Sequence, residues 1–106
     1  MNRRDDPEAF ERYMREHQRC LGIAVRQMRE EYGLTPDQLA KRAEVSVQWL
    51  QKLETNQLHT NYSIGRLDRI VRAMGVELFD LYKRTDDMLG LPSWLEEEGA
   101  QSDEQN

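Results

Sequence analysis

The sequence predicts an all-α fold of five helices in a single domain. Apolar residues recur at intervals of three and four along most of the chain, which is the spacing of one helical face. Capping residues and glycines stand where these stretches would begin and end. No strand pattern of any length interrupts them. A chain of 106 residues with 38% hydrophobic content can bury one modest core.

The first predicted helix covers residues 6–32. Asp6 is a plausible N-cap, Pro7 stands where the first turn tolerates proline, and Gly33 ends the helix as a C′ glycine does. Gly22 interrupts this stretch. The sequence therefore leaves open whether the segment is one long helix or two helices joined at this point.

The second predicted helix begins at the segment TPDQLAKRA, residues 35–43. Thr35 is its expected N-cap, Pro36 takes the first helical position, and Gln38 completes a capping box three residues after the cap. Glu44, Val45 and Ser46 then leave room only for a tight turn.

Ser46 can cap a third helix that runs to about Glu54. Two short helices joined by a three-residue turn form a helix-turn-helix, whose second helix can lie in the major groove of DNA. A polar loop follows, and then a fourth helix over residues 63–74 that Gly75 stops. The segment VELFDLYKR, residues 76–84, predicts a short fifth helix.

The charge of the chain is unevenly distributed. All fifteen Lys and Arg residues lie at or before Arg84, and seven of the twenty acidic residues follow it. Residues 1–85 therefore carry a net charge of +2, although the whole chain carries −5. A mildly basic folded part is compatible with nucleic-acid binding but does not require it.

The third predicted helix has one polar side. At about 100° per residue, Leu50 and Leu53 face one way. The opposite side carries four residues without an acidic group: Gln48, Gln51, Lys52 and Thr55. A glutamine amide can pair with adenine, and a lysine can reach guanine or a phosphate. Spacing alone is equally compatible with an ordinary solvated helix surface.

Residues 21–82 resemble a known family. The segments LGIAVRQMREEYGLTPDQLAKRAEVSVQWLQKLETN and LDRIVRAMGVELFDL are similar to the lambda-repressor-like (Xre-type) helix-turn-helix DNA-binding domains of bacteria and phages. The resemblance implies a five-helix domain whose third helix reads DNA. It also implies that Arg29 and Glu54 form an internal salt bridge between the first helix and the end of the third.

The resemblance places Val47, Gln48 and Lys52 at base-contacting positions, with Trp49 and Gln51 at the edge of that surface. Trp49 lies about 40° from Leu53 around the helix, which favours a partly buried role. Helix N-termini and the following loop are expected to anchor phosphates. The complete expected set of DNA-contacting residues is Thr35, Ser46, Val47, Gln48, Trp49, Gln51, Lys52, Thr55, Gln57 and Asn61.

Two positions depart from the family pattern. Pro36 stands where the family often has a glutamine whose side chain and backbone N–H hold a phosphate, and proline offers neither donor. Glu44 stands at the turn position that glycine usually occupies. If the backbone there is left-handed, a residue other than glycine costs roughly 1 kcal/mol.

The expected organisation is a helical extension (1–20), the helix-turn-helix domain (21–84) and an acidic, disordered tail (85–106). The apolar face of the extension, with Phe10 and Tyr13, would pack against the fifth helix and Trp94 or against a second copy, and we expect a homodimer. The extension or the segment 92–98 could also bind a protein partner. A solubilising end is the favoured interpretation of the tail, ahead of competition with DNA and then of docking a partner.

The expected function is that of a cytoplasmic, sequence-specific regulator, a repressor that binds double-stranded DNA without catalysis. The alternative is an antitoxin-like or adaptor protein that acts mainly through protein contacts. The sequence shows no nucleophile with a positioned base, so we do not expect an enzyme. Cys20, His17 and His59 lack metal-ligand spacing, and no apolar run is long enough to cross a membrane, so we expect no cofactor, metal site or membrane segment.

Overall fold

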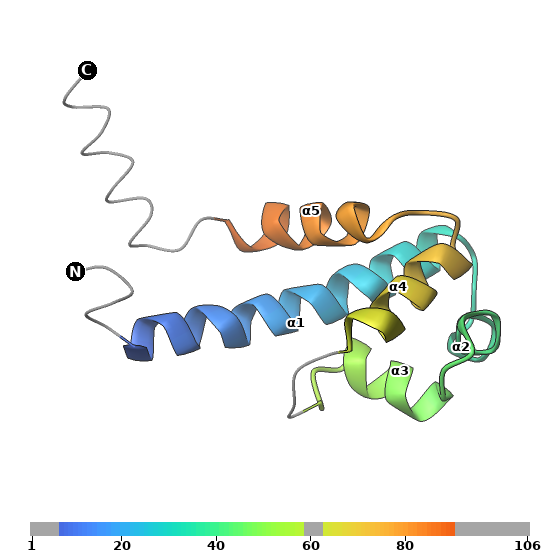
Figure 1. The fold of residues 1–106 in the computed structure, drawn as a ribbon, viewed down its shortest axis with the longest axis horizontal. Helices are drawn as coiled ribbons and strands as arrows, with labels where there is room; N and C mark the ends of the chain where they lie inside the picture. Colours follow the sequence, from blue (N-terminus) through green and yellow to red (C-terminus); the bar gives the residue numbers. More distant parts are fainter. Residues whose placement is uncertain (1–6, 59–62, 91–106) are drawn as a thin grey trace, which may run out of the picture.

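Five helices and no strand make up the part of the chain that the computed structural model describes, residues 7–58 and 63–90 (Figure 1). The predicted all-α, five-helix fold is therefore confirmed. The helices are α1 (Pro7–Glu31), α2 (Pro36–Ala43), α3 (Val47–Glu54), α4 (Ile64–Ala73) and α5 (Leu78–Leu89).

The first helix, α1, is one continuous helix of 25 residues and passes through Gly22 without a break. Gly22 is buried, and a Cβ atom at this position would collide with the backbone carbonyl oxygen of Leu53. The glycine is required by the close approach of α1 and α3, because any side chain would force the two helices apart. This settles the alternative that the sequence left open.

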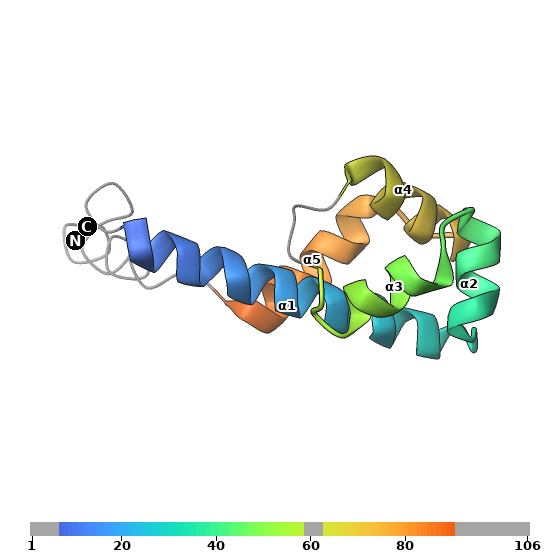
Figure 2. The same ribbon diagram turned by 90° about the horizontal axis from the view of Figure 1, so that it is seen from below.

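The core lies between α1 and the other four helices. The last helix, α5, runs back alongside α1, and α2, α3 and α4 close the domain around the C-terminal half of α1 (Figures 1 and 2). The largest fully buried apolar side chains come from all five helices: Leu21, Val25, Leu39, Leu50, Leu53, Leu67, Ile70, Val71 and Leu81. The short helices thus depend on shared burial for their stability.

The ends of α1, α2, α3 and α4 share one hydrogen-bond pattern. In each, the chain turns through a residue with positive φ, and the next N–H donates to the carbonyl five residues earlier. The residues with positive φ are Gly33, Glu44, Asn56 and Gly75. The following residue is apolar and at least half-buried in three cases, Leu34, Val45 and Val76. These turns fix the direction in which each following helix departs.

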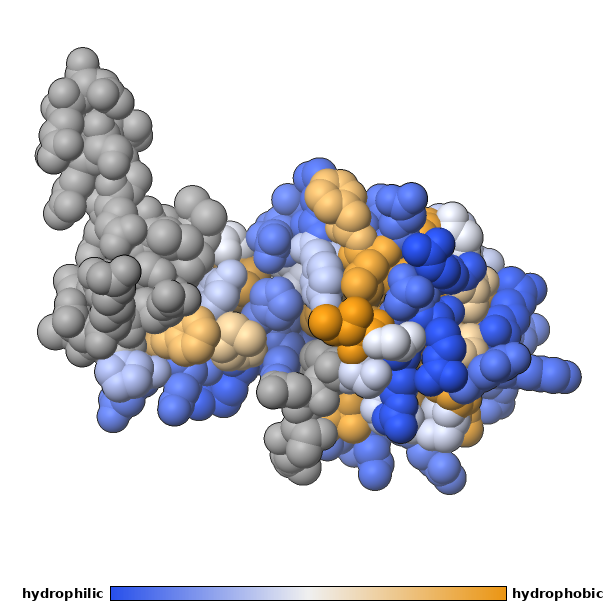
Figure 3. Space-filling view, viewed as in Figure 1, coloured by the Kyte–Doolittle hydropathy of each residue, from blue (hydrophilic) through white to orange (hydrophobic). Residues whose placement is uncertain are grey.

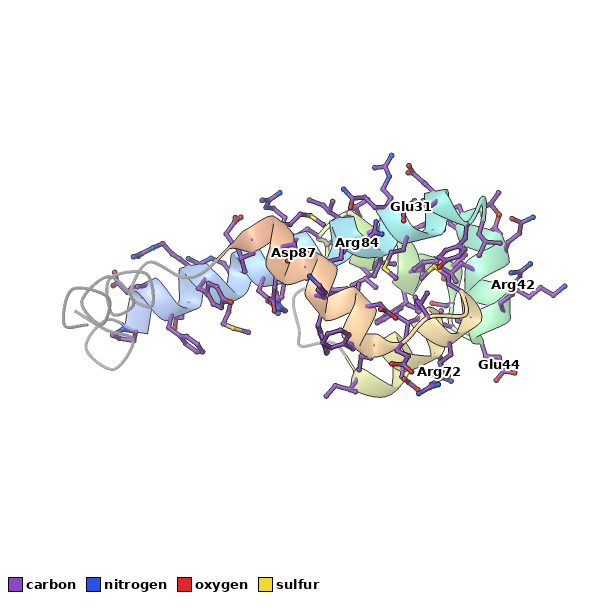
Figure 4. The ribbon with its side chains drawn as sticks, turned by 90° about the horizontal axis from the view of Figure 1, so that it is seen from above. Glu31, Arg42, Glu44, Arg72, Arg84 and Asp87 are labelled. Atoms are coloured by element: carbon purple, nitrogen blue, oxygen red, sulfur yellow. The ribbon has the colours of Figure 1, made fainter. Side chains whose placement is uncertain are left out.

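The fifth helix is longer than the sequence predicted, because it continues five residues beyond Arg84 to Leu89. The extra turn contains Thr85, which is fully buried and whose hydroxyl donates to the carbonyl of Leu81 at 2.8 Å. A threonine that satisfies its hydroxyl in this way packs as an apolar residue. Arg84 also pairs with Glu31 at 2.8 Å and so joins α5 to the end of α1 (Figure 4).

Glu44 has φ 58° and adopts the left-handed conformation that was predicted to be strained for this residue. Replacing it by glycine should stabilise the protein by about 1 kcal/mol, because glycine has no Cβ to clash with the following carbonyl. Urea denaturation of the Glu44→Gly variant measures the gain. Asn56→Gly is the matched control, since asparagine tolerates φ 57° better and should gain less. A stability loss in Glu44→Gly would contradict the strain.

Candidate nucleic-acid interface

The exposed side of α3 is the candidate interface. The helix lies at the lower edge of the molecule in Figure 1 and faces the viewer in Figure 2. Leu50 and Leu53 are fully buried against the core. The polar residues on the opposite side are all exposed: Gln48, Gln51, Lys52 and Thr55. This surface carries one positive charge and no negative charge, which suits an approach to phosphate-rich DNA.

The start of α3 is fixed by its cap. The Ser46 hydroxyl accepts a hydrogen bond from the N–H of Trp49 at 3.0 Å, and the preceding residue, Val45, donates its N–H to the carbonyl of Ala40 at 3.0 Å. These bonds tie the turn to both helices. The angle between α2 and α3 is therefore set by hydrogen bonds as well as by packing.

The end of α3 is fixed by an ion pair with α1. The guanidinium of Arg29 donates to both carboxylate oxygens of Glu54, each at 2.8 Å, and a third N–H donates to the carbonyl of Leu34 at 2.8 Å. The two side chains are only 10% and 5% exposed. The hydrogen bonds to Glu54 raise the pKa of Arg29 above its ordinary value. These are the residues that the family resemblance pairs, and they join α1, the α1–α2 loop and α3.

Trp49 lies at the edge of the polar surface. It is half-buried and packs against the hydrophobic core, as its place on the helical wheel predicted. The Arg66 guanidinium carbon lies 5.3 Å from the centre of the ring. Val47, at the other edge, is likewise half-buried against the core. Both edges of the surface are thus held by packing, and one of them carries an arginine of α4.

The N-terminus of α2 has few donors to offer a phosphate. Thr35 and Gln38 form the predicted capping box: the Thr35 hydroxyl accepts from the Gln38 N–H at 3.1 Å, and the Gln38 side chain accepts from the Thr35 N–H at 2.9 Å. Pro36 has no N–H. The N–H of Asp37 stays available, but it stands beside its own exposed carboxylate. The Thr35 hydroxyl hydrogen is the second donor that remains.

The predicted DNA-contacting residues that follow α3 differ in how available their polar groups are. The Thr55 hydroxyl donates to the carbonyl of Gln51 at 2.6 Å, so its oxygen remains free only to accept. Gln57 is exposed, with its N–H bonded to the carbonyl of Lys52 at 2.8 Å. Asn61 lies outside the described residues. The structure therefore brings the predicted residues from Ser46 to Thr55 onto α3 and its two caps, with Gln57 just beyond them.

One residue near this surface was not among those predicted from the sequence. In the sequence, Arg66 is one of three arginines spaced along one face of the fourth helix, with Arg69 and Arg72, and this pattern fits a solvated face paired with Asp68 or Glu77 as well as it fits phosphate binding. Its contact with Trp49 joins residues seventeen positions apart, and no local pattern reports such a contact.

Elsewhere, the described surface has few features that would suggest a second binding or catalytic site. Shallow hollows lie between α2 and α4, with Arg42, Glu44 and Arg72, and between α1 and α5, with Glu31 and Arg84 (Figure 4). Within residues 7–58 and 63–90, no cluster of three His, Cys, Asp or Glu side chains could hold a metal ion, and no buried side-chain nitrogen or oxygen lacks a hydrogen-bond partner. No helix in those ranges has the length and apolar character needed to span a membrane.

Comparison with known proteins relates the chain to a helix-turn-helix domain family and to a gene regulator. A family model described as a helix-turn-helix domain matches residues 21–89. A crystal structure of the clp gene regulator ClgR from Corynebacterium glutamicum is similar at a TM-score of 0.63 and 26% identity, covering 70% of this chain and 92% of that chain. A second ClgR structure gives 0.64 and 25%, covering 82% and 84%. No curated protein matches the chain at a significant level.

Removing one partner of the Arg29–Glu54 pair should destabilise the domain strongly. Glu54→Ala leaves a nearly buried guanidinium without its carboxylate, which costs about 3–5 kcal/mol. Chemical denaturation measures the loss. Glu30→Ala is the matched control, because Glu30 pairs with Arg26 where both side chains are more than half exposed. Its loss should stay below about 1 kcal/mol. Equal losses in the two variants would contradict a special role for the buried pair.

Proposed function

The chain belongs to the helix-turn-helix domain family, and from that membership we propose that it is a repressor that binds a specific double-stranded DNA operator as a dimer. The family and the likeness to the ClgR regulator structures support a DNA-binding transcriptional regulator. Our proposal adds three points: which residues contact DNA, that the protein is a dimer, and that it represses transcription.

The exposed side of α3 is the observation that carries this proposal. Its polar residues stand clear of the core, and its two ends are held by the Ser46 cap and the Arg29–Glu54 ion pair. A surface held in this way keeps its side chains at fixed separations, which sequence-specific contacts to bases require. A solvated helix face needs no such support.

We assign direct base contacts to Gln48 and Lys52. The amide of Gln48 can donate to and accept from the N6 and N7 atoms of one adenine, and Lys52 can donate to guanine O6 and N7. Val47 and Gln51 flank them, with Val47 offering an apolar contact to a thymine methyl group. Ser46 and Thr35, at the starts of α3 and α2, are assigned to the phosphate backbone together with Thr55 and Gln57.

A dimer follows from the size of the module. One helix-turn-helix buries only about 600–1,000 Å² on DNA, and two copies on two half-sites are the usual solution. Large apolar side chains that stay exposed on α1, α4 and α5 could form the contact: Met14, Ile64, Phe79 and Met88. Figure 3 shows apolar surface gathered over α4 and α5. Exposed apolar area of this kind often marks a protein interface.

The rival function is an antitoxin-like or adaptor protein that works through protein contacts. Two observations favour it, the net charge of −5 and the poor phosphate site at the N-terminus of α2. The absence of acidic residues on the exposed side of α3 favours DNA. Purified protein that enriches no sequence from a random duplex library, while the full chain co-purifies with one partner, would decide for the rival.

Gln48→Ala should relax the preference at one base pair and cost about 1–3 kcal/mol on the preferred site, with little change on random DNA, because the amide contacts a base edge. Binding titrations on the operator selected by the unsubstituted protein and on a scrambled duplex measure both effects. Gln27→Ala, which removes an exposed glutamine from α1, is the matched control and should leave both affinities unchanged. Equal losses on the two duplexes would contradict a base contact by Gln48.

Analytical ultracentrifugation of the full chain with its selected duplex should show two copies on each DNA molecule, because one module reads too few bases for a unique site. The selected sequence should contain two related half-sites. A monomer both free and on DNA would rule out the proposed dimer and leave the role of α3 untouched.

A further inference from the structure

The contact between Arg66 and Trp49 assigns a function to an arginine outside the helix-turn-helix. We propose that Arg66 binds a phosphate group of the DNA backbone and that the ring of Trp49 holds it in position. This inference rests on the proposed function, since it requires DNA on the exposed side of α3. The Arg66 guanidinium carbon lies 5.3 Å from the ring centre, within the range of a cation–π contact.

The position of Trp49 brings Arg66 to the edge of the DNA-facing surface. At about 100° per residue, Trp49 lies about 60° around α3 from exposed Lys52 and about 40° from buried Leu53. The ring therefore bridges the polar side of α3 and the core. An arginine against this ring adds a positive group from the first turn of α4 at the edge of the surface that carries Lys52.

The chemistry of the contact leaves the arginine able to bind. A cation–π contact occupies none of the guanidinium's N–H donors with an acceptor oxygen, so the donors can still bind the oxygens of a phosphate. Arg66 is exposed, and its guanidinium forms no ion pair with any residue that the structure describes. Arg72, on the same helix, is instead paired with Asp68 at 3.1 Å.

The N-terminus of α2 is a poor phosphate site, which leaves a role for a phosphate anchor at α4. At the N-terminus of α2, Pro36 lacks an N–H, the capping box uses the N–H groups of Thr35 and Gln38, and Asp37 adds a negative charge. That end attracts a phosphate poorly. With little anchoring from the N-terminus of α2, a positive group at the α4 edge is placed to fix the orientation of α3 on the duplex.

The test compares the full chain with three arginine variants on its selected operator over a range of salt concentrations. Arg66→Gln should weaken binding roughly tenfold or more on every sequence, and the slope of log K against log salt should fall by about one, as loss of one phosphate contact requires. Arg66→Lys should recover only part of the affinity, because it keeps the charge but loses the planar donors.

Arg69→Gln is the matched control. It removes the same charge from the same helix, but Arg69 lines the hollow between α2 and α4. It should change affinity and salt slope much less than Arg66→Gln does. Equal effects of the two variants would overturn the proposal, because they would show that each arginine acts only through the overall positive charge of the domain.

The role of Trp49 is tested by coupling. Trp49→Leu should weaken DNA binding in the unsubstituted protein and add little in the Arg66→Gln background, because the ring then has no arginine to hold. Trp49→Phe, which keeps an aromatic ring, should retain more affinity. Denaturation of each variant in the absence of DNA shows whether the fold is intact. Additive losses would rule out positioning by Trp49.

The outcomes separate this proposal from the proposed function. If the unsubstituted protein binds no duplex in preference to a neutral control, both are wrong. If it binds a specific operator but Arg66→Gln keeps full affinity and salt slope, α3 reads DNA without this anchor and only the present inference fails.

Discussion

The placement of α3 depends on the nearly buried ion pair between Arg29 and Glu54. An isolated helix of eight residues is not stable in water, so α3 forms and points outward only because other parts of the chain hold it. The guanidinium of Arg29 contacts the end of α3 and the carbonyl of Leu34 in the loop before α2. Gly22 allows α1 to approach closely enough for this contact. The ion pair and Gly22 together fix the position of α3 from the side that faces the core.

The two flanks of α3 differ in chemistry. On the α2 side, the capping box and Pro36 use or remove most donors that could reach a phosphate. On the α4 side, Arg66 rests on Trp49 with its donors free of carboxylates in the described chain. Since residues 1–85 carry a net charge of only +2, nonspecific attraction to DNA is weak. In the proposed complex, affinity then depends on a few well-placed groups, and only the groups that contact bases distinguish one sequence from another.

Local signals in the sequence were sufficient for most of the fold. Thr35, Pro36 and Gln38 predicted the start of α2, and Gly33 and Gly75 predicted the ends of two helices, because capping is a short-range interaction. Gly22 was ambiguous, since a glycine within a helix indicates either a break or a close contact, and only the position of Leu53 decides between them. The last turn of α5 was missed because Thr85 is polar in sequence but satisfied and buried in the fold. Arg66 was missed because its partner is distant in sequence.

The central claim is that DNA lies on the exposed side of α3, and amide chemical-shift changes on titration with the selected operator duplex test it most directly. We predict the largest changes at residues 47–55 and near Arg66, with small changes along the N-terminal half of α1. Changes concentrated on α1 and α5, with α3 unaffected, would contradict the claim and show that the duplex or another partner binds a different face.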